Sequence, residues 1–164
     1  MKRLAFAVIS AGLLSACASD GTARQRALEE AMRSAERAAM AALPETALQA
    51  QTLRPGECGL FLWSQTDTSK FIFFSKAISE TAMLTQGELP VTLTQVSAGG
   101  DLFGEFNTRT SYRSEAGSEV DLVLSPGEIL EGGQRVKDGL ITVTNEAGWL
   151  TKLPVLGVRA CQPK

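Results

Sequence analysis

The apolar positions of this chain follow three successive patterns. Residues 4–14 form one short and almost continuous apolar run. Residues 22–43 are rich in the strong helix formers Ala, Glu, Arg, Met and Leu, and they end before Pro44, which disfavours a helical conformation for the residue before it. From Leu53 onward, short apolar or alternating runs are separated by turn residues. These patterns predict an N-terminal apolar segment, one helix and a β-rich region.

The β-rich region is predicted to contain eight or nine short strands. The apolar runs 58–63 and 70–76 flank the polar segment 64–69, a pattern typical of a hairpin. Residues 102–112 are predicted to form one bent strand, with the bend at Gly104. Turns are predicted at 98–101, 115–118, 125–127, 138–139 and 145–148, and strands at 149–152 and 155–161. The expected fold class is mainly β, a small antiparallel β sandwich or barrel preceded by one N-terminal α-helix.

The predicted helix begins with Thr22-Ala23-Arg24-Gln25, which has the form of a capping box. Its apolar seam follows a heptad spacing. The seam consists of Leu28, Met32, Ala35, Ala39 and Ala42. The pattern lasts little more than two heptads, which is short for a coiled coil. It therefore favours a helical spacer over self-association of two copies through this seam.

The N-terminal apolar run has the flanks of a secretory signal. Lys2 and Arg3 precede it, and small residues follow it up to Cys17. The run is too short to cross a hydrocarbon core, which requires about 20 residues. A buried helix, or a signal cut after another residue, would give a similar run, but its N-terminal position argues against a core helix.

The residues Leu14-Ser15-Ala16-Cys17 resemble the lipobox of bacterial lipoprotein precursors, which is a Leu and two small residues followed by Cys. In that family the Cys sulfur receives a diacylglycerol, the signal is removed before the Cys, and the new amino group is usually acylated, typically with palmitate. The resemblance covers roughly the first 20 residues. It implies that residues 1–16 are a signal peptide and that Cys17 is the lipid attachment site, so that the membrane is a partner through this lipid.

The resemblance also implies a location. In enteric bacteria an Asp directly after the lipidated Cys retains a lipoprotein in the inner membrane, and Asp20 lies too late to match that signal. The expected location is therefore the periplasmic face of the outer membrane. The expected domains are the signal peptide 1–16, a lipidated leader and helical stalk 17–52, and a β domain 53–164.

Charge and composition exclude several classes of function. Without Lys2 and Arg3, 14 of the 16 basic residues remain against 18 acidic residues, a net charge of −4. Nucleic-acid binding is therefore not expected, because it requires a basic surface. The chain has no His, and so it lacks the commonest general base and metal ligand.

Once Cys17 carries lipid, Cys58 and Cys161 remain as a pair. In an exported protein a disulfide between them is favoured over two buried thiols, since such compartments are oxidising. A metal site would be incomplete with two thiols and no His.

The search for chemistry gives no catalytic, cofactor-binding or metal-binding residues. The closest carboxylate pairs are Asp101 with Glu105 and Glu119 with Asp121. Glu119 and Asp121 would share one strand face, which alternates with the apolar Val120 and Leu122 and is therefore typical of a solvated surface. Arg109, Tyr112 and Arg113 form a small basic and aromatic cluster that suits an acidic partner or a glycan, or else a solvated strand end. The aromatic residues are expected to be mostly core, with a ligand pocket or partner surface as the alternative. They are Phe61, Trp63, Phe71, Phe73, Phe74, Phe103, Phe106, Tyr112 and Trp149.

The sequence thus predicts a lipid-anchored bacterial cell-envelope protein with a non-catalytic β domain that binds or supports another envelope component, an unknown protein or glycan. The alternative is an anchored periplasmic inhibitor or small-ligand binder. That design is similar to the small β-barrel lipoprotein inhibitors of lysozyme, although their Ser-Gly-Ser-Gly loop is absent here.

Overall fold

The structure is a computed structural model that describes residues 19–41, 47–86 and 89–164. It contains one helix, α1 (Ser19–Ala41), which begins three residues before the predicted start at Thr22. The strands are β1 (Cys58–Ser64), β2 (Phe71–Lys76), β3 (Thr81–Gln86), β4 (Leu89–Phe103), β5 (Phe106–Ser114), β6 (Glu119–Leu130), β7 (Gly133–Thr144) and β8 (Leu150–Cys161). The helix and the strands belong to two compact units, with the boundary between Arg37 and Ala38.

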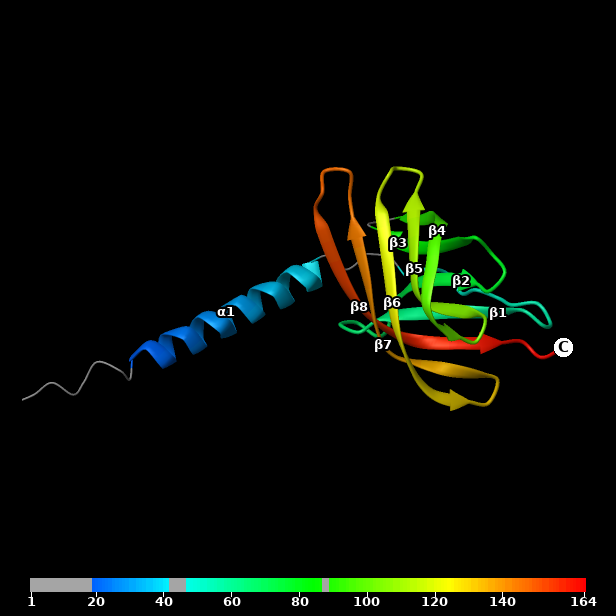
Figure 1. Ribbon diagram of the computed structural model, residues 1–164, viewed down its shortest axis with the longest axis horizontal. Helices are drawn as coiled ribbons and strands as arrows, with labels where there is room; N and C mark the ends of the chain where they lie inside the picture. Colours follow the sequence, from blue (N-terminus) through cyan, green and yellow to red (C-terminus); the bar gives the residue numbers. More distant parts are fainter. Residues whose placement is uncertain (1–18, 42–46, 87–88) are drawn as a thin grey trace, which may run out of the picture. The chain divides into compact units, whose positions relative to one another are not determined.

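The strands form one closed antiparallel barrel in which each strand pairs with its neighbours in the sequence. The barrel closes where β1 pairs with β8, over a continuous register from Cys58 opposite Cys161 to Ser64 opposite Val155 (Figure 1). The predicted mainly β fold with one N-terminal helix is therefore confirmed, and of the two predicted architectures the chain forms the barrel.

Alternation along the strands fills the barrel interior. On β6, Val120, Leu122 and Leu124 are buried, while the residues between them are exposed. The largest side chains that are almost fully buried come from every strand except β5, so the first and the last strand both contribute to the core. They are Leu60, Leu62, Ile72, Phe73, Leu84, Leu93, Phe103, Val120, Leu122, Val136, Ile141 and Val155. The interior is thus a packed core and not a channel.

Three predicted turns are wrong, because those residues lie inside long strands. Residues 98–101, 125–127 and 138–139 fall within β4, β6 and β7, each at a register shift of the ladder. Ser125 lies opposite Asp138, so two of these segments form a paired irregularity across β6 and β7. Gly, Pro and Asp serve here as bulge residues, which let a strand bend sharply without ending.

The opposite error occurs at residues 102–112, where one bent strand was predicted. Phe103 pairs with Phe106, and Gly104 and Glu105 form a tight turn between β4 and β5. Gly104 has a φ of 62°, which suits the first position of a two-residue hairpin turn. The two predicted strands at the C-terminus, in contrast, are one strand, β8, which continues through Pro154.

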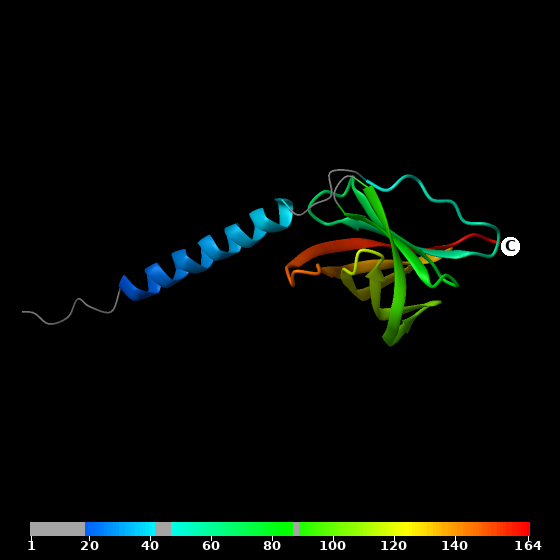
Figure 2. The ribbon, with the colours of Figure 1, turned by 90° about the horizontal axis from the view of Figure 1, so that it is seen from above.

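Residues 47–54, here called the strap, cover part of the outer barrel surface, although the sequence had assigned residues up to 52 to the stalk. The Leu48 amide donates a hydrogen bond to the Phe71 carbonyl oxygen over 2.7 Å. Leu48 is buried with Phe71 and Phe74, and Leu53 packs on the same group. In Figure 2 the chain that follows residue 46 runs along the outside of the barrel and enters β1 near the C-terminus.

The helix α1 exposes Leu28 and Met32 of the predicted seam, and Ala35 is also exposed. The side chain of Ala39 and all of Ala42 lie outside the described residues, as does the proposed lipid site Cys17. Within the described residues, α1 is not apolar enough over a sufficient length to span a bilayer. Self-association through the seam stays a prediction.

Candidate functional site at the mouth of the barrel

One end of the barrel, here called the mouth, is formed by the start of β1, the end of β8 and the turns 77–80 and 104–105. Cys58 and Cys161 lie directly opposite each other there, with 4.0 Å between their Cα atoms, and they form a disulfide that spans 103 sequence positions. The predicted disulfide is confirmed. It links the first and last strands at the edge where the barrel closes.

Beside the disulfide, Arg159 connects β8 to the β4–β5 turn. Its Nη1 atom lies 2.8 Å from Glu105 Oε2, and its guanidinium carbon lies 5.9 Å from the centroid of the Phe103 ring. The Arg159 side chain is 16% exposed and the Glu105 side chain 48%. A Cβ atom on Gly104 would collide with Arg159, so this glycine lets the turn sit directly on the guanidinium. The ion pair therefore holds the turn over the rim of the mouth.

Next to this pair is a half-open pocket of about 310 Å³, here called the mouth pocket. Its walls are mostly apolar and include Ala77, Ile78 and the Cys58 end of the disulfide. Two charged side chains of the wall, Glu57 and Lys76, pair with each other at 2.9 Å. The Arg54 amide and Lys76 both donate to Glu57, and these hydrogen bonds hold the pKa of its carboxyl below the ordinary value.

Behind the mouth pocket is a smaller and more polar cavity of about 100 Å³, here called the mouth cleft. The hydroxyls of Ser75, Thr110 and Tyr112 line it, and all three residues are buried. Burial raises the pKa of Tyr112, and the neighbouring hydroxyls of Ser75 and Thr110 oppose this shift. Gln95 and Asn107 add amide groups to the polar lining, and Lys76, Ser79 and Glu105 also line the cleft. The cleft offers uncharged groups that can both donate and accept hydrogen bonds.

One arrangement at the mouth has the ligand spacing of a metal site but not its chemistry. Ligand atoms of Cys58, Glu105 and Cys161 lie within 4.8 Å of one another. Both sulfurs are used in the disulfide, and the carboxylate already pairs with Arg159. Since cysteine binds metals as a thiolate, the oxidised pair does not fit a metal ion.

The predicted basic and aromatic cluster does not form. Arg109 and Arg113 are exposed, whereas Tyr112 is buried in the core, because alternate residues of β5 point to opposite sides of the barrel wall. Tyr112 instead packs edge-on against Phe73, at 5.7 Å between ring centroids. Arg113 forms an exposed ion pair with Glu119 over 2.7 Å.

The predicted carboxylate pair lies on the outer barrel surface. Glu119 and Asp121 are both exposed on β6, and Asp121 accepts a hydrogen bond of 2.6 Å from the Ser111 hydroxyl. Each carboxylate has a partner on β5, and neither lines the mouth pocket or the mouth cleft. This is the solvated face that the alternation predicted.

The aromatic residues divide between the inside and the outside of the barrel. Phe73, Phe103, Phe106 and Tyr112 belong to the interior core. The outer group lies under or beside the strap and consists of Phe61, Trp63, Phe71 and Phe74, in which successive ring centroids are 5.0 to 6.5 Å apart. Trp149 is exposed in the β7–β8 turn. The outer group is a second, smaller core that attaches the strap.

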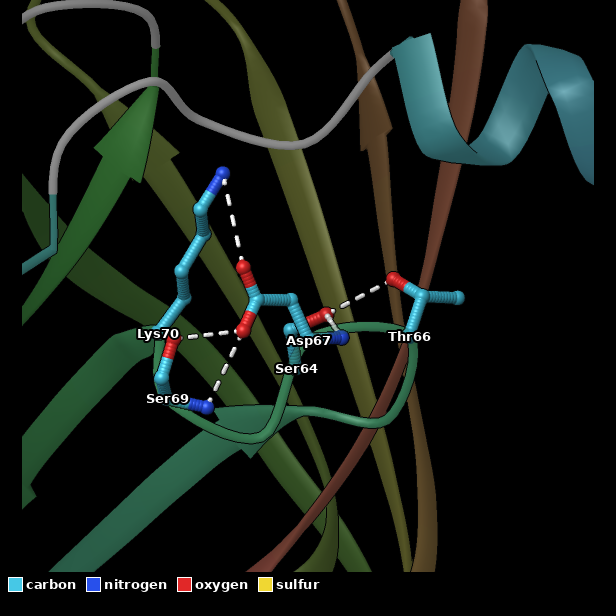
Figure 3. Close-up of polar contacts among 5 residues, drawn as sticks. All are labelled: Ser64, Thr66, Asp67, Ser69 and Lys70. Carbon is cyan, nitrogen blue, oxygen red and sulfur yellow. Dashed lines mark hydrogen bonds and ion pairs between the residues drawn. The ribbon is translucent and has the colours of Figure 1, made fainter.

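The β1–β2 turn lies at the other end of the barrel and is stabilised by its own side chains (Figure 3). The buried Ser64 hydroxyl accepts the Asp67 amide over 3.2 Å and contacts the Thr66 hydroxyl at 2.9 Å. Asp67 accepts from both the hydroxyl and the amide of Ser69, and these bonds hold the pKa of its carboxyl below the ordinary value. Lys70 adds an ion pair at 3.8 Å. The polar cluster therefore stabilises a turn and is not a candidate site.

Sequence reasoning missed Lys76 and Arg159 as parts of a site, and it considered Glu105 only as a carboxylate near Asp101. Glu105 and Arg159 are 54 positions apart, and only the closed barrel brings them together. A tight turn at Gly104-Glu105 could have been predicted from the glycine, but residues 102–112 were predicted to be one strand. No family model matches this chain, and neither the curated proteins nor the solved structures contain a match to it.

Proposed function

We propose that this protein is a lipid-anchored component of a bacterial cell envelope whose barrel binds another envelope component without catalysis. The observation that carries the proposal is the lipobox-like segment Leu14-Ser15-Ala16-Cys17 after a positively charged start and an apolar run. Two or more acyl chains on Cys17 would give stable anchoring, at about 0.8 kcal/mol for each buried methylene. The proposed anchor faces the periplasm from the outer membrane.

Two features of the barrel support this proposal. The Cys58–Cys161 disulfide suits an oxidising compartment such as the periplasm. At the mouth, Glu57 is paired with Lys76 and Glu105 with Arg159. A cavity with paired charges and uncharged polar groups suits binding.

The mouth pocket and the mouth cleft also favour the second candidate function, a small-ligand binder on a lipid anchor. The barrel interior is packed, so a ligand has room at the mouth rather than along the barrel axis. The two functions are compatible when the ligand is itself part of the envelope.

The anchor is tested with the variant Cys17→Ser in a bacterial host. Cells that express the wild-type chain or the variant are labelled with radioactive palmitate and then fractionated. We expect label and membrane association for the wild type and neither for Cys17→Ser. The matched control Cys58→Ser/Cys161→Ser also removes cysteines, yet it should keep its label. A processed and membrane-bound Cys17→Ser protein would refute the anchor.

The binding role is tested by crosslinking in intact cells followed by purification of the protein. A dominant crosslinked envelope component is expected for the wild type. Substitutions at the mouth should reduce its recovery, whereas Ile129→Ser on the β6–β7 hairpin should not. Recovery that is equal in all variants would place the binding surface elsewhere and contradict a role for the mouth.

A further inference from the structure

The two mouth cavities adjoin and form one site with two different halves. Lys76, Ala77, Ser79 and Glu105 line both of them. The outer half is apolar, open and about 310 Å³, while the inner half is polar and about 100 Å³. Ligand pockets commonly occupy about 300–1,000 Å³, so the site has the size for one small molecule or one unit of a polymer.

The charges at this site favour a neutral ligand. Lys76 already pairs with Glu57 and Glu105 with Arg159, at 2.9 and 2.8 Å. A charged ligand would have to compete with one partner of a pair for its counter-charge. A neutral ligand can enter while both pairs stay intact.

The two halves also require a ligand with an apolar group next to hydrogen-bonding groups. In the mouth pocket, Ala77, Ile78 and the disulfide offer contacts for a methyl group, and Ile78 is 97% exposed at the rim. In the mouth cleft, the amide of Asn107 can donate and accept. The hydroxyls of Ser75 and Thr110 can accept, and Ser75 already donates to the carbonyl oxygens of Lys76 and Thr81. A neutral sugar that bears an acetamido group combines these features, because it has a methyl group, an amide and several hydroxyls but no charge.

We propose that the mouth pocket and the mouth cleft together bind an N-acetylated sugar unit of a glycan. This inference rests on the proposed function and names the envelope component that the barrel binds. The acetamido methyl packs against Ala77 and Ile78, and the sugar hydroxyls bond to the polar groups of the cleft. The Glu105–Arg159 ion pair holds the β4–β5 turn that closes one side of the site.

The test is saturation-transfer NMR on the full-length chain in mild detergent, with the N-acetylglucosamine dimer as the probe. We expect the strongest transfer at the acetamido methyl signal. The glucosamine dimer, which lacks the acetyl group and carries positive charge, should show at least a tenfold weaker affinity, and the glucose dimer should be similarly weak. A short neutral apolar peptide is included as a competitor of another chemical class.

Two variants and a matched control locate the site. Ala77→Trp should fill the mouth pocket and abolish transfer, and Ile78→Ser should weaken binding by about threefold or more through loss of an apolar contact. Ile78 is in an exposed turn, so its variant is expected to fold even if Ala77→Trp does not. Ile129→Ser removes an isoleucine that is 84% exposed and lies outside both cavities, and it should bind like the wild type.

Several outcomes would overturn the proposal. The first is that the N-acetylated dimer receives no saturation transfer from the protein, and the second is that the glucose dimer receives as much. The third is that Ile78→Ser binds the N-acetylated dimer as well as the wild type does. The fourth is that the apolar peptide displaces the N-acetylated dimer, which would mean that the site is an apolar peptide site. This outcome is separable from that of the proposed function. If Cys17→Ser stays membrane-bound while the wild type binds the sugar, the anchor is refuted and the sugar site is supported. If the wild type carries lipid label but does not bind the sugar, the anchor is supported and the sugar site is refuted.

Discussion

The disulfide that links β1 and β8, where the barrel closes, should contribute a measurable part of the stability of the protein. Replacing Cys58 and Cys161 together by Ala removes a crosslink across 103 sequence positions. The chain-entropy model assigns about 4.7 kcal/mol to a loop of about 100 residues, and native disulfides in small domains typically contribute about 2–5 kcal/mol. Because β1 and β8 stay paired over six further residues beyond this bond, we expect the barrel to fold without it.

We therefore expect the double variant to lose about 3–5 kcal/mol of unfolding free energy. At roughly 4 °C per kcal/mol for a domain of this size, its Tm should fall by about 12–20 °C. The measurement is urea denaturation followed by tryptophan fluorescence, together with thermal melting. Since the crosslink acts mainly on the unfolded chain, the dependence of the unfolding free energy on urea should become steeper in the variant, as its unfolded state expands.

The control is the wild-type protein with and without a dithiol reductant. Reduction should lower the wild-type Tm to that of the double variant and should leave the variant unchanged. A loss below about 1 kcal/mol would refute the reasoning, because it would mean that the disulfide constrains the unfolded chain very little. A large loss with an unchanged urea dependence would place the effect in the native state instead.

Three further predictions concern the strap, the pairing of β1 with β8, and the core. Leu48→Ala should cost about 2 kcal/mol and expose the strap to limited proteolysis before the barrel unfolds, because Leu48 is 6% exposed, whereas the same change at the exposed Leu89 should cost less than about 0.5 kcal/mol. Gly157→Ala should cost more than about 3 kcal/mol in urea denaturation, because the new methyl group would overlap the Phe61 carbonyl oxygen on β1, and Gly99→Ala, with open space around its Cβ, should be nearly neutral. Tyr112 is the only tyrosine, so absorbance titration should report its pKa directly and place it above the ordinary value of 10.0. Because the unfolded chain ionises first, stability should then fall as the pH rises above 10.0, and Tyr112→Phe should remove that part of the loss.

The sequence was informative where the signal was local or followed from simple counting. Alternation at Val120 and Leu122 placed the first half of β6 correctly, and the even pair Cys58 and Cys161 predicted the disulfide. Turn residues were ambiguous, because Gly and Asp serve both tight turns and bulges. Asp138-Gly139 has the form of a hairpin turn, but β7 continues through it, since Asp138 lies opposite Ser125 of β6 and not at a reversal of the chain.

The site itself was not predictable from local patterns, because it depends on the register of distant strands. Glu105 acquires its role only when the β4–β5 turn reaches Arg159 on β8. Tyr112 appeared to belong with Arg109 and Arg113, which are its near neighbours in sequence. Their separation follows from the register that points Tyr112 inward, and that register is fixed by pairing along the whole of β5.

The strap runs along the barrel from the end away from the mouth to the mouth itself. At one end, Leu48 bonds to Phe71, beside the β1–β2 turn, and at the other the Gly56 amide donates to the Gln162 carbonyl oxygen next to the disulfide. Within the barrel unit, the described chain therefore enters at the end opposite the mouth pocket and the mouth cleft, and reaches the mouth only after it has crossed the outer wall.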